Sequence, residues 1–381
     1  MAFEPFGRDT WRDPYPLYAD LRRHDPVHRA PGGYWVLTRF ADVWRAAGSA
    51  ATFSSAQGLT FENEAASLLP TMVMMDPPDH TRYRRLVNKG FTPRRVQELE
   101  PALRSYVRDL VEELAAGPEA DFVAGLARPV PSWVVAHYLG VPLEDRQRFD
   151  AWTEGIVQGG DDGSLLQAVT DLYGYFTELI ERRRVEPGDD LVSLLVQADD
   201  EGRGIGAEGI LGFGFVMIAG GNDTATGLLG GSAELLTAEP DQRRRLREDP
   251  ALMAGAVDEL LRLTSPVQGL CRVAVTDTQV GDVPIAAGER VYLCYGSANR
   301  DPEEFGPTAD QLDVGRAIPR MLTFSSGNHF CLGAAAARLQ GRVVLEELLA
   351  RCPDFTVDAG RGVFADGAFT RRYQSLPFSP G

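Results

Sequence analysis

The segment Phe324-Ser-Ser-Gly327-Asn-His329-Phe-Cys331-Leu-Gly333 is the most informative stretch of this 381-residue chain. It places a cysteine in a glycine-containing loop, directly before a run of small residues, Ala334 to Ala337, that opens a predicted helix. The free N–H groups and the dipole at a helix start stabilise a thiolate, and glycines let a backbone approach a large flat group. A lone Cys-x-Gly, however, more often marks an inert core cysteine.

Around this loop, most of the chain has the spacing of amphipathic or buried helices. Apolar residues recur at three- and four-residue steps in 94–113, 163–184, 206–236, 250–263 and 334–351. Short strand patterns separated by turns occupy 34–38, 272–275, 278–280 and 290–294. The long apolar helix needs packing partners on all sides. We therefore expect a mainly α protein with small β-sheets, in which residues 1–381 form a single domain.

Composition excludes several classes of protein. The net charge is −16, from 38 Lys+Arg against 54 Asp+Glu, which disfavours nucleic acid and anionic membranes as general partners. No signal peptide or anchor is evident, and the apolar run 210–221 is shorter than the roughly 20 residues that span a bilayer. The four cysteines form no C-x-x-C pair, so we expect thiols in a cytoplasmic protein.

Two further segments carry residue pairs with chemical potential. In Glu259-Leu-Leu-Arg262 the charges share a helix face, which by itself indicates a surface ion pair worth about 0.2–0.5 kcal/mol. In Ala219-Gly220-Gly221-Asn222-Asp223-Thr224 each glycine costs the helix about 1 kcal/mol relative to alanine. The Thr224 hydroxyl can bond back to the Gly220 carbonyl and distort the helix. Either close helix packing or a groove for proton delivery explains this segment.

The segment Asp76-Pro-Pro-Asp-His80-Thr-Arg82-Tyr-Arg84-Arg85-Leu86 places a histidine and an arginine one helical turn apart. Both side chains can reach one anion. Each residue alone is equally consistent with an ordinary salt bridge.

Taken in order, the four segments resemble the signatures of the cytochrome P450 family, D-P-P-x-H-T-x-x-R, A/G-G-x-D/E-T, E-x-x-R and F-x-x-G-x-x-x-C-x-G. Similar segments at 13–18, 298–302 and 337–342 extend the resemblance over nearly the whole chain. It implies the triangular, mainly helical P450 fold of soluble bacterial, actinobacterial-like members, with haem b as cofactor. Ser325 departs from the pattern, since bacterial members usually have glycine there.

The resemblance also implies a role for each matching residue. Cys331 is the axial ligand of the haem iron, whose thiolate favours O–O cleavage. Asp223 and Thr224 form the acid–alcohol pair that delivers protons to dioxygen. The remaining haem contacts are His80, Arg84, Arg272, Phe324, Gly327, His329, Gly333 and Gly220. The ion pair of Glu259 and Arg262, completed by Arg316, is structural.

Substrate contacts are expected by position only. Phe213, Val216 and Met217 share a helix face with Thr224, while Val267, Gln268 and Leu270 follow the E-x-x-R helix. The loop 57–75 lies where the family has its variable lid. This mostly apolar set predicts a medium-sized hydrophobic molecule, which suits secondary metabolism.

The expected activity is hydroxylation or epoxidation by a monooxygenase using O2. Because no flavin or iron–sulfur motif is present, two electrons must come from a partner, expected to be a ferredoxin with its reductase. Candidates for its docking patch are Arg94, Arg95, Arg338 and Arg342. The expected oligomeric state is a monomer.

Three alternatives remain open. One is oxidative coupling or peroxide-driven oxidation, and another is a P450-fold protein that binds haem ligands without oxygenating them. The acid–alcohol pair argues against both, because a ligand binder does not need proton delivery and peroxide users in the family tend to lack the pair. The third is a protein without haem, in which Cys331 is structural.

Overall fold

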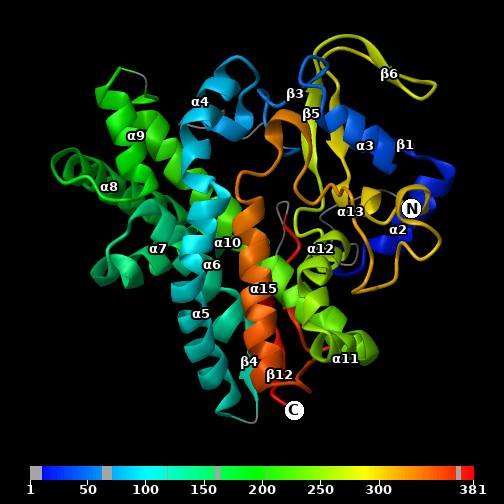
Figure 1. Ribbon diagram of the computed structural model, residues 1–381. Helices are drawn as coiled ribbons and strands as arrows, with labels where there is room; N and C mark the ends of the chain where they lie inside the picture. Colours follow the sequence, from blue (N-terminus) through cyan, green and yellow to red (C-terminus); the bar gives the residue numbers. More distant parts are fainter. Residues whose placement is uncertain (1–10, 62–70, 118, 159–163, 203, 366–369) are drawn as a thin grey trace.

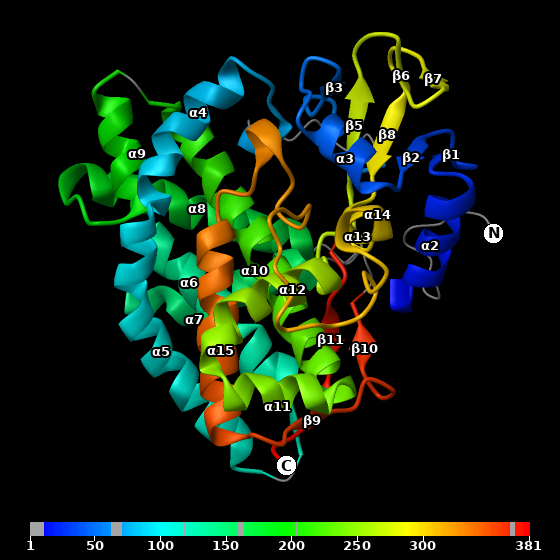
Figure 2. The same ribbon diagram turned by 45° about the vertical axis from the view of Figure 1, so that its right-hand side comes forward.

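The computed structural model describes residues 11–381 except 62–70, 118, 159–163, 203 and 366–369. Helices dominate one side of the molecule, and most of the strands lie on the other side with α2, α3 and α13 (Figures 1 and 2). The longer helices are α2 Tyr15–His24, α3 Phe40–Ala47, α4 Asp79–Val87, α5 Pro93–Ala115, α6 Pro129–Leu139, α7 Arg146–Gln158, α8 Ser164–Val185, α9 Leu191–Asp200, α10 Gly206–Ala238, α11 Pro240–Glu248, α12 Met253–Thr264 and α15 Ala334–Arg351. Two one-turn helices, α13 Tyr295–Ala298 and α14 Pro302–Phe305, follow the main sheet.

Helix α10 runs through the middle of the core and contacts α6, α7, α8, α9, α11, α12 and α15. Its glycines let these neighbours approach closely. A Cβ atom added at Gly221 would lie 2.8 Å from Val135 of α6, and one added at Gly231 would lie 2.7 Å from Thr264 of α12. The apolar sequence of α10 is therefore explained by burial on nearly all sides.

The main sheet has five strands in the order β1-β2-β8-β5-β3. These strands are β1 Val27–Arg29, β2 Trp35–Leu37, β3 Phe53–Ser54, β5 Leu270–Ala274 and β8 Arg290–Leu293. Strands β2 and β8 pair in parallel, with Trp35 opposite Val291, and the other neighbours pair antiparallel. The sheet thus joins the start of the chain to the segments that follow α12.

Three small sheets complete the fold. They pair β4 Ala120–Asp121 and β9 Thr356–Val357 with β12 Pro377–Ser379, β6 Thr278–Val280 with β7 Val283–Ile285, and β10 Val363–Phe364 with β11 Tyr373–Ser375. The last pair is the C-terminal hairpin. Among the described helices, none combines the length and the apolarity that a bilayer-spanning helix requires.

Helices α5 and α15 lie side by side (Figure 1) and are joined by ion pairs. Arg104 of α5 contacts Glu346 at 2.5 Å and Glu347 at 2.9 Å, and Arg342 of α15 pairs with Glu100. These contacts fix α15, whose N-terminus receives the loop that carries Cys331.

Candidate functional site

Cys331 lies in the loop that enters α15, and its backbone is fixed by a hydrogen bond from its N–H to the carbonyl of Phe324, 2.8 Å long. The N–H of Gly333, the residue that caps α15, donates to the Cys331 sulfur. The residue as a whole is exposed, yet burial raises the pKa of its thiol, while the Gly333 N–H and the charges of Arg84 and Arg338 act in the opposite direction. Burial prevails, and these three neighbours are the groups that favour the thiolate.

The same loop packs against α3 through glycines. Gly327 has a φ of +67°, and a Cβ added there would lie 2.8 Å from the Cα of Gly48. The Ser326 hydroxyl donates to the carbonyl of Trp44 at 3.2 Å. We predicted that Gly327 allows approach to a flat ligand, but its backbone conformation and its contact with Gly48 already require glycine.

The buried His80 meets the half-buried His329 of the cysteine loop. The rings of His80 and His329 lie 4.3 Å apart, and neither Nε2 atom has a hydrogen-bond partner among the described residues. Burial lowers both pKa values, and with Arg272 and His80 nearby the pKa of His329 falls to about 3. Both rings are therefore neutral at physiological pH, and a neutral imidazole still offers one N–H to an anion.

Two arginines flank these rings. The Arg84 Nη1 donates to the carbonyl of Asn328 at 3.2 Å, and Arg272, 2% exposed, donates from Nη1 to the carbonyl of Cys271 at 2.7 Å. No carboxylate pairs with either guanidinium within the described ranges. This cluster of His80, His329, Arg84 and Arg272 is thus built to hold an acidic group that the chain itself does not supply.

On α10, the Thr224 hydroxyl donates to the Gly220 carbonyl at 2.8 Å, as predicted. The expected distortion is absent, because α10 is a continuous α-helix at this point. The two glycines differ in function: Gly221 packs on Val135, whereas a Cβ added at Gly220 would meet no atom within 4 Å. Open space therefore adjoins the turn that carries Asp223 and Thr224.

Asp223 has a partner that the sequence did not predict. Its Oδ1 lies 2.7 Å from the Nε of Arg372, which enters from the C-terminal hairpin. Burial raises the pKa of Asp223, and the Arg372 charge acts in the opposite direction. No motif in the sequence connects the two residues.

These observations fit a haem. An exposed cysteine at a helix N-terminus suits iron, the open space at Gly220 suits a flat ring, and the histidine–arginine cluster suits two propionates. Phe324 contributes packing, since its ring lies under the Arg338 guanidinium at 4.7 Å.

The structure brings Glu259, Arg262 and Arg316 together, with Glu259 and Arg262 fully buried and Arg316 half-buried. Arg262 donates from Nε and Nη2 to the two oxygens of Glu259 at 2.7 and 2.8 Å, and Arg316 reaches Oε1 at 3.0 Å. Arg262 Nη1 also donates to the carbonyl of Asn299. The Asn299 side chain in turn accepts from the N–H of Leu322 and donates to Thr323, at the start of the cysteine loop. Asn299 was missed as the connection between the two motifs.

The residues predicted to contact substrate have different surroundings. Val216 and Met217 on α10 are half-buried, and Val267 and Leu270 after α12 are half-buried too. Phe213 of α10 belongs to the main hydrophobic core.

Gln268 is fully buried, and its Nε2 donates to the carbonyls of Thr264 and Ser265 at the end of α12. Its Oε1 has no hydrogen-bond partner among the described residues. The expected contact of Gln268 with substrate stays a prediction. Part of the predicted lid, 62–70, lies outside the described residues.

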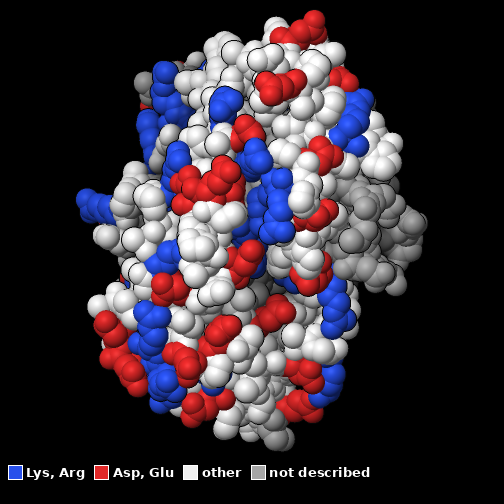
Figure 3. All heavy atoms as spheres, turned by 90° about the vertical axis from the view of Figure 1, so that its right-hand side faces the viewer, with Lys and Arg blue, Asp and Glu red and all other residues white. Residues whose placement is uncertain are grey.

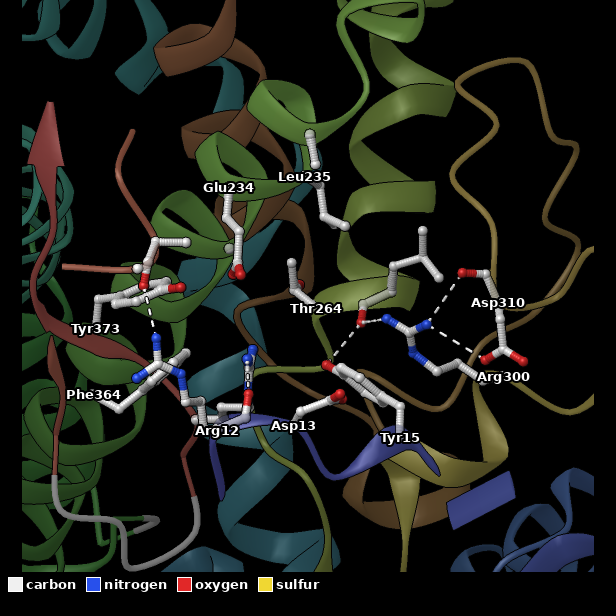
Figure 4. A pocket seen from close by; sticks show the side chains of 16 residues that line it. Arg12, Asp13, Tyr15, Glu234, Leu235, Thr264, Arg300, Asp310, Phe364 and Tyr373 are labelled. Atoms are coloured by element: carbon white, nitrogen blue, oxygen red, sulfur yellow. Dashed lines mark hydrogen bonds and ion pairs between the residues drawn. The ribbon is translucent and has the colours of Figure 1, made fainter. Parts of the chain in front are cut away.

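A cavity of about 440 Å³ lies elsewhere, between the N-terminal segment, the second half of α10 and the C-terminal hairpin (Figure 4). Glu234 and Tyr373 lie on one side, and Tyr15 and Arg300 on the other. Its lining includes Arg371 but no residue of the cysteine loop, so it is separate from the candidate site.

The four arginines predicted to form a basic patch are all paired with acids. Arg94 pairs with Glu98, Arg95 with Asp189, Arg338 with Asp258, and Arg342 with Glu100. This pairing weakens the expected positive potential at those positions.

Comparison with known proteins places the site in context. The cytochrome P450 family model matches residues 232–360. Cytochrome P450 130 of Mycobacterium tuberculosis is 52% identical over 398 residues, covering 99% of this chain and 97% of the relative. The vitamin D(3) 25-hydroxylase of Pseudonocardia autotrophica is 36% identical over 387 residues, covering 99% and 96%. The structure of the bacillaene polyketide synthase cytochrome P450 PksS of Bacillus subtilis 168 matches with a TM-score of 0.91 at 31% identity, over 100% of both chains.

Proposed function

The chain belongs to the cytochrome P450 family and is a monooxygenase of that family, and on this premise we propose that it hydroxylates or epoxidises a medium-sized hydrophobic molecule of secondary metabolism. The half-buried apolar side chains of Val216 and Met217 beside the open turn of α10 support an apolar substrate. The names of two relatives, a vitamin D(3) hydroxylase and a polyketide synthase P450, support this size class.

The proposed cofactor is haem b with Cys331 as its axial ligand. The histidine–arginine cluster would hold the propionates, and Gly220, Phe324 and Gly333 would lie near the ring or its ligand. When bound, haem supplies the activation of O2, and the protein supplies position and protons. Electrons would come from a ferredoxin and its reductase.

The observation that carries this proposal is the turn Gly220–Thr224, where a hydroxyl and a largely buried carboxyl lie within one helical turn of the open space at Gly220. A protein that only binds ligands has no need for an acid and an alcohol at such a place. Thr224 would hydrogen-bond the oxygen that reacts, and Asp223 would resupply protons to it.

Replacing Thr224 tests the proposal. In Thr224→Ala, electron and O2 consumption should continue while product formed per electron pair falls by about tenfold, the equivalent of one hydrogen bond. Thr224→Ser, which keeps the hydroxyl, should retain most of the coupling. The substrate would be chosen by its ability to shift the Soret band of the ferric protein. Unchanged coupling in Thr224→Ala would refute the assigned role.

A further inference from the structure

The C-terminal hairpin packs on α10 at the turn that follows Asp223. Thr370 forms a β-bridge with Val267, and the N–H of Arg371 donates to the carbonyl of Pro266 at 2.7 Å. These contacts fix residues 370 and 371 on the segment that follows α12, and the next side chain, Arg372, lies beside Asp223 of α10.

Gly227 makes this approach possible. It lies one helical turn after Asp223, and a Cβ added there would lie 2.8 Å from the carbonyl oxygen of Arg371 and 3.0 Å from Pro266. Any side chain at this position would push the hairpin outward. The missing side chain therefore brings the Arg372 backbone close enough for its guanidinium to reach the acid.

The resulting ion pair is shielded from water. The side chains of Arg372 and Asp223 are 10% and 21% exposed, and Nε lies 2.7 Å from Oδ1. Arg372 is the charged group that acts on the Asp223 carboxyl among the described residues. An attraction in such surroundings is stronger than on the surface, because little solvent screens it.

We propose that Arg372 is a positioning residue for proton delivery, which holds the Asp223 carboxylate ionised and in place beside Thr224. The proposal rests on the proposed role of Asp223 and Thr224. On this proposal, proton delivery depends on the position of the C-terminal hairpin. It also explains why position 227 is a glycine, because a side chain there would displace the hairpin.

The adjacent Arg371 provides a matched control. Its Nε and Nη2 donate to the carbonyls of Trp11 and Arg12, and it lines the separate cavity of Figure 4. Arg371→Ala therefore disturbs the same hairpin without removing the charge beside Asp223. Arg372→Lys retains a charge but loses the planar fork of the guanidinium.

The direct test is infrared titration of the ferric holoprotein. The protonated carboxyl band of Asp223 is identified as the difference between each variant and the same variant carrying Asp223→Asn. In Arg372→Ala its protonation midpoint should move up by about 1–3 pH units relative to the wild type, because an opposite charge has been removed. Arg371→Ala should leave the midpoint in place, and Arg372→Lys should fall between. An unmoved midpoint in Arg372→Ala would overturn the proposal.

Measuring coupling, the product formed per electron pair consumed, shows whether a failure lies in this proposal or in the proposed function. Arg372→Ala and Asp223→Asn should each lower product per electron pair, and the double variant should be no worse than Asp223→Asn alone. If Asp223→Asn leaves coupling intact, the proton-delivery role of Asp223 fails, whatever the infrared result. If Asp223→Asn uncouples but Arg372→Ala does not, the positioning role of Arg372 fails.

Discussion

Ser325 has a left-handed backbone conformation, with a φ of 59°, in the loop that carries Cys331. A non-glycine residue there costs roughly 1–2 kcal/mol. The structure also supplies a partner: the Ser325 hydroxyl lies 3.1 Å from the hydroxyl of Tyr295, and both side chains are buried. A residue that departs from the family pattern is thus held by a hydrogen bond that glycine could not make.

A double-mutant cycle on this pair is the first prediction from single residues. Ser325→Ala and Tyr295→Phe should each destabilise the holoprotein by about 1 kcal/mol, and the double variant should lose about 1 kcal/mol less than their sum. Urea unfolding measures these free energies. The Soret position of the ferrous carbon monoxide complex reports whether Cys331 still binds as thiolate. Strict additivity would show that the hydroxyl pair contributes nothing.

At the level of residues, local chemistry was predictable and distant pairing was not. The bond from Thr224 to the Gly220 carbonyl follows from a spacing of four residues within one helix. The contact of Asp223 with Arg372 depends on how the hairpin seats against Gly227, which no local pattern encodes.

Among the elements, the long periodic helices were predicted closely. The predicted range 334–351 coincides with α15, and 94–113 and 206–236 fall within two residues of α5 and α10. The periodicity in 250–263 is divided between a 3-10 turn, Pro250–Leu252, and α12.

Several other helices were missed for identifiable reasons. Helix α6 starts with Pro129 and Pro131 and is apolar on nearly all sides, so it lacks the amphipathic pattern. Helices α3 and α11 have fewer than ten residues, which gives little periodicity to detect. Gln268 shows the same limit, since the sequence does not reveal that its amide nitrogen donates to the carbonyls at the end of α12.

Helix α12 offers a test of its buried ion cluster. Glu259 and Arg262 are both fully buried, so Glu259→Gln should cost about 3–5 kcal/mol of unfolding free energy by leaving two guanidinium groups without a charged acceptor. The neighbouring Asp258→Asn breaks a more exposed pair with Arg338 and should cost less than about 1 kcal/mol. Equal losses in urea unfolding of the two variants would contradict a structural role for the buried cluster.

The charge of the whole molecule is strongly negative, but its cations are not gathered in the patch we expected. Figure 3 shows acidic and basic side chains interspersed over one face. Arg338 and Arg342 are already neutralised by Asp258, Glu100 and Glu346. An acidic partner would gain little from arginines that are held by acids of this chain.

A better-placed pair lies beside the cysteine loop, at a hollow of about 400 Å³ between α4 and residues 327 and 328. Arg85 lines this hollow, and Lys89 lies one helical turn further on. Both side chains are exposed, and within the described ranges neither has an ion-pair partner. Their charges are therefore available to a docking protein on the side from which Cys331 enters.

The rate of haem reduction by an acidic [2Fe–2S] ferredoxin should show whether Arg85 and Lys89 or Arg338 and Arg342 form the docking surface. In Arg85→Ala/Lys89→Ala the second-order rate of haem reduction at low salt should fall by about tenfold, and its dependence on ionic strength should weaken, because free charges steer association. Arg338→Ala/Arg342→Ala should change the rate much less, since those charges are already compensated. Rapid-mixing measurements over a range of salt concentrations test this, with an unchanged Soret titration as evidence of an intact site. If the rate of haem reduction fell more in Arg338→Ala/Arg342→Ala, the docking surface would instead include α15, as the sequence analysis predicted.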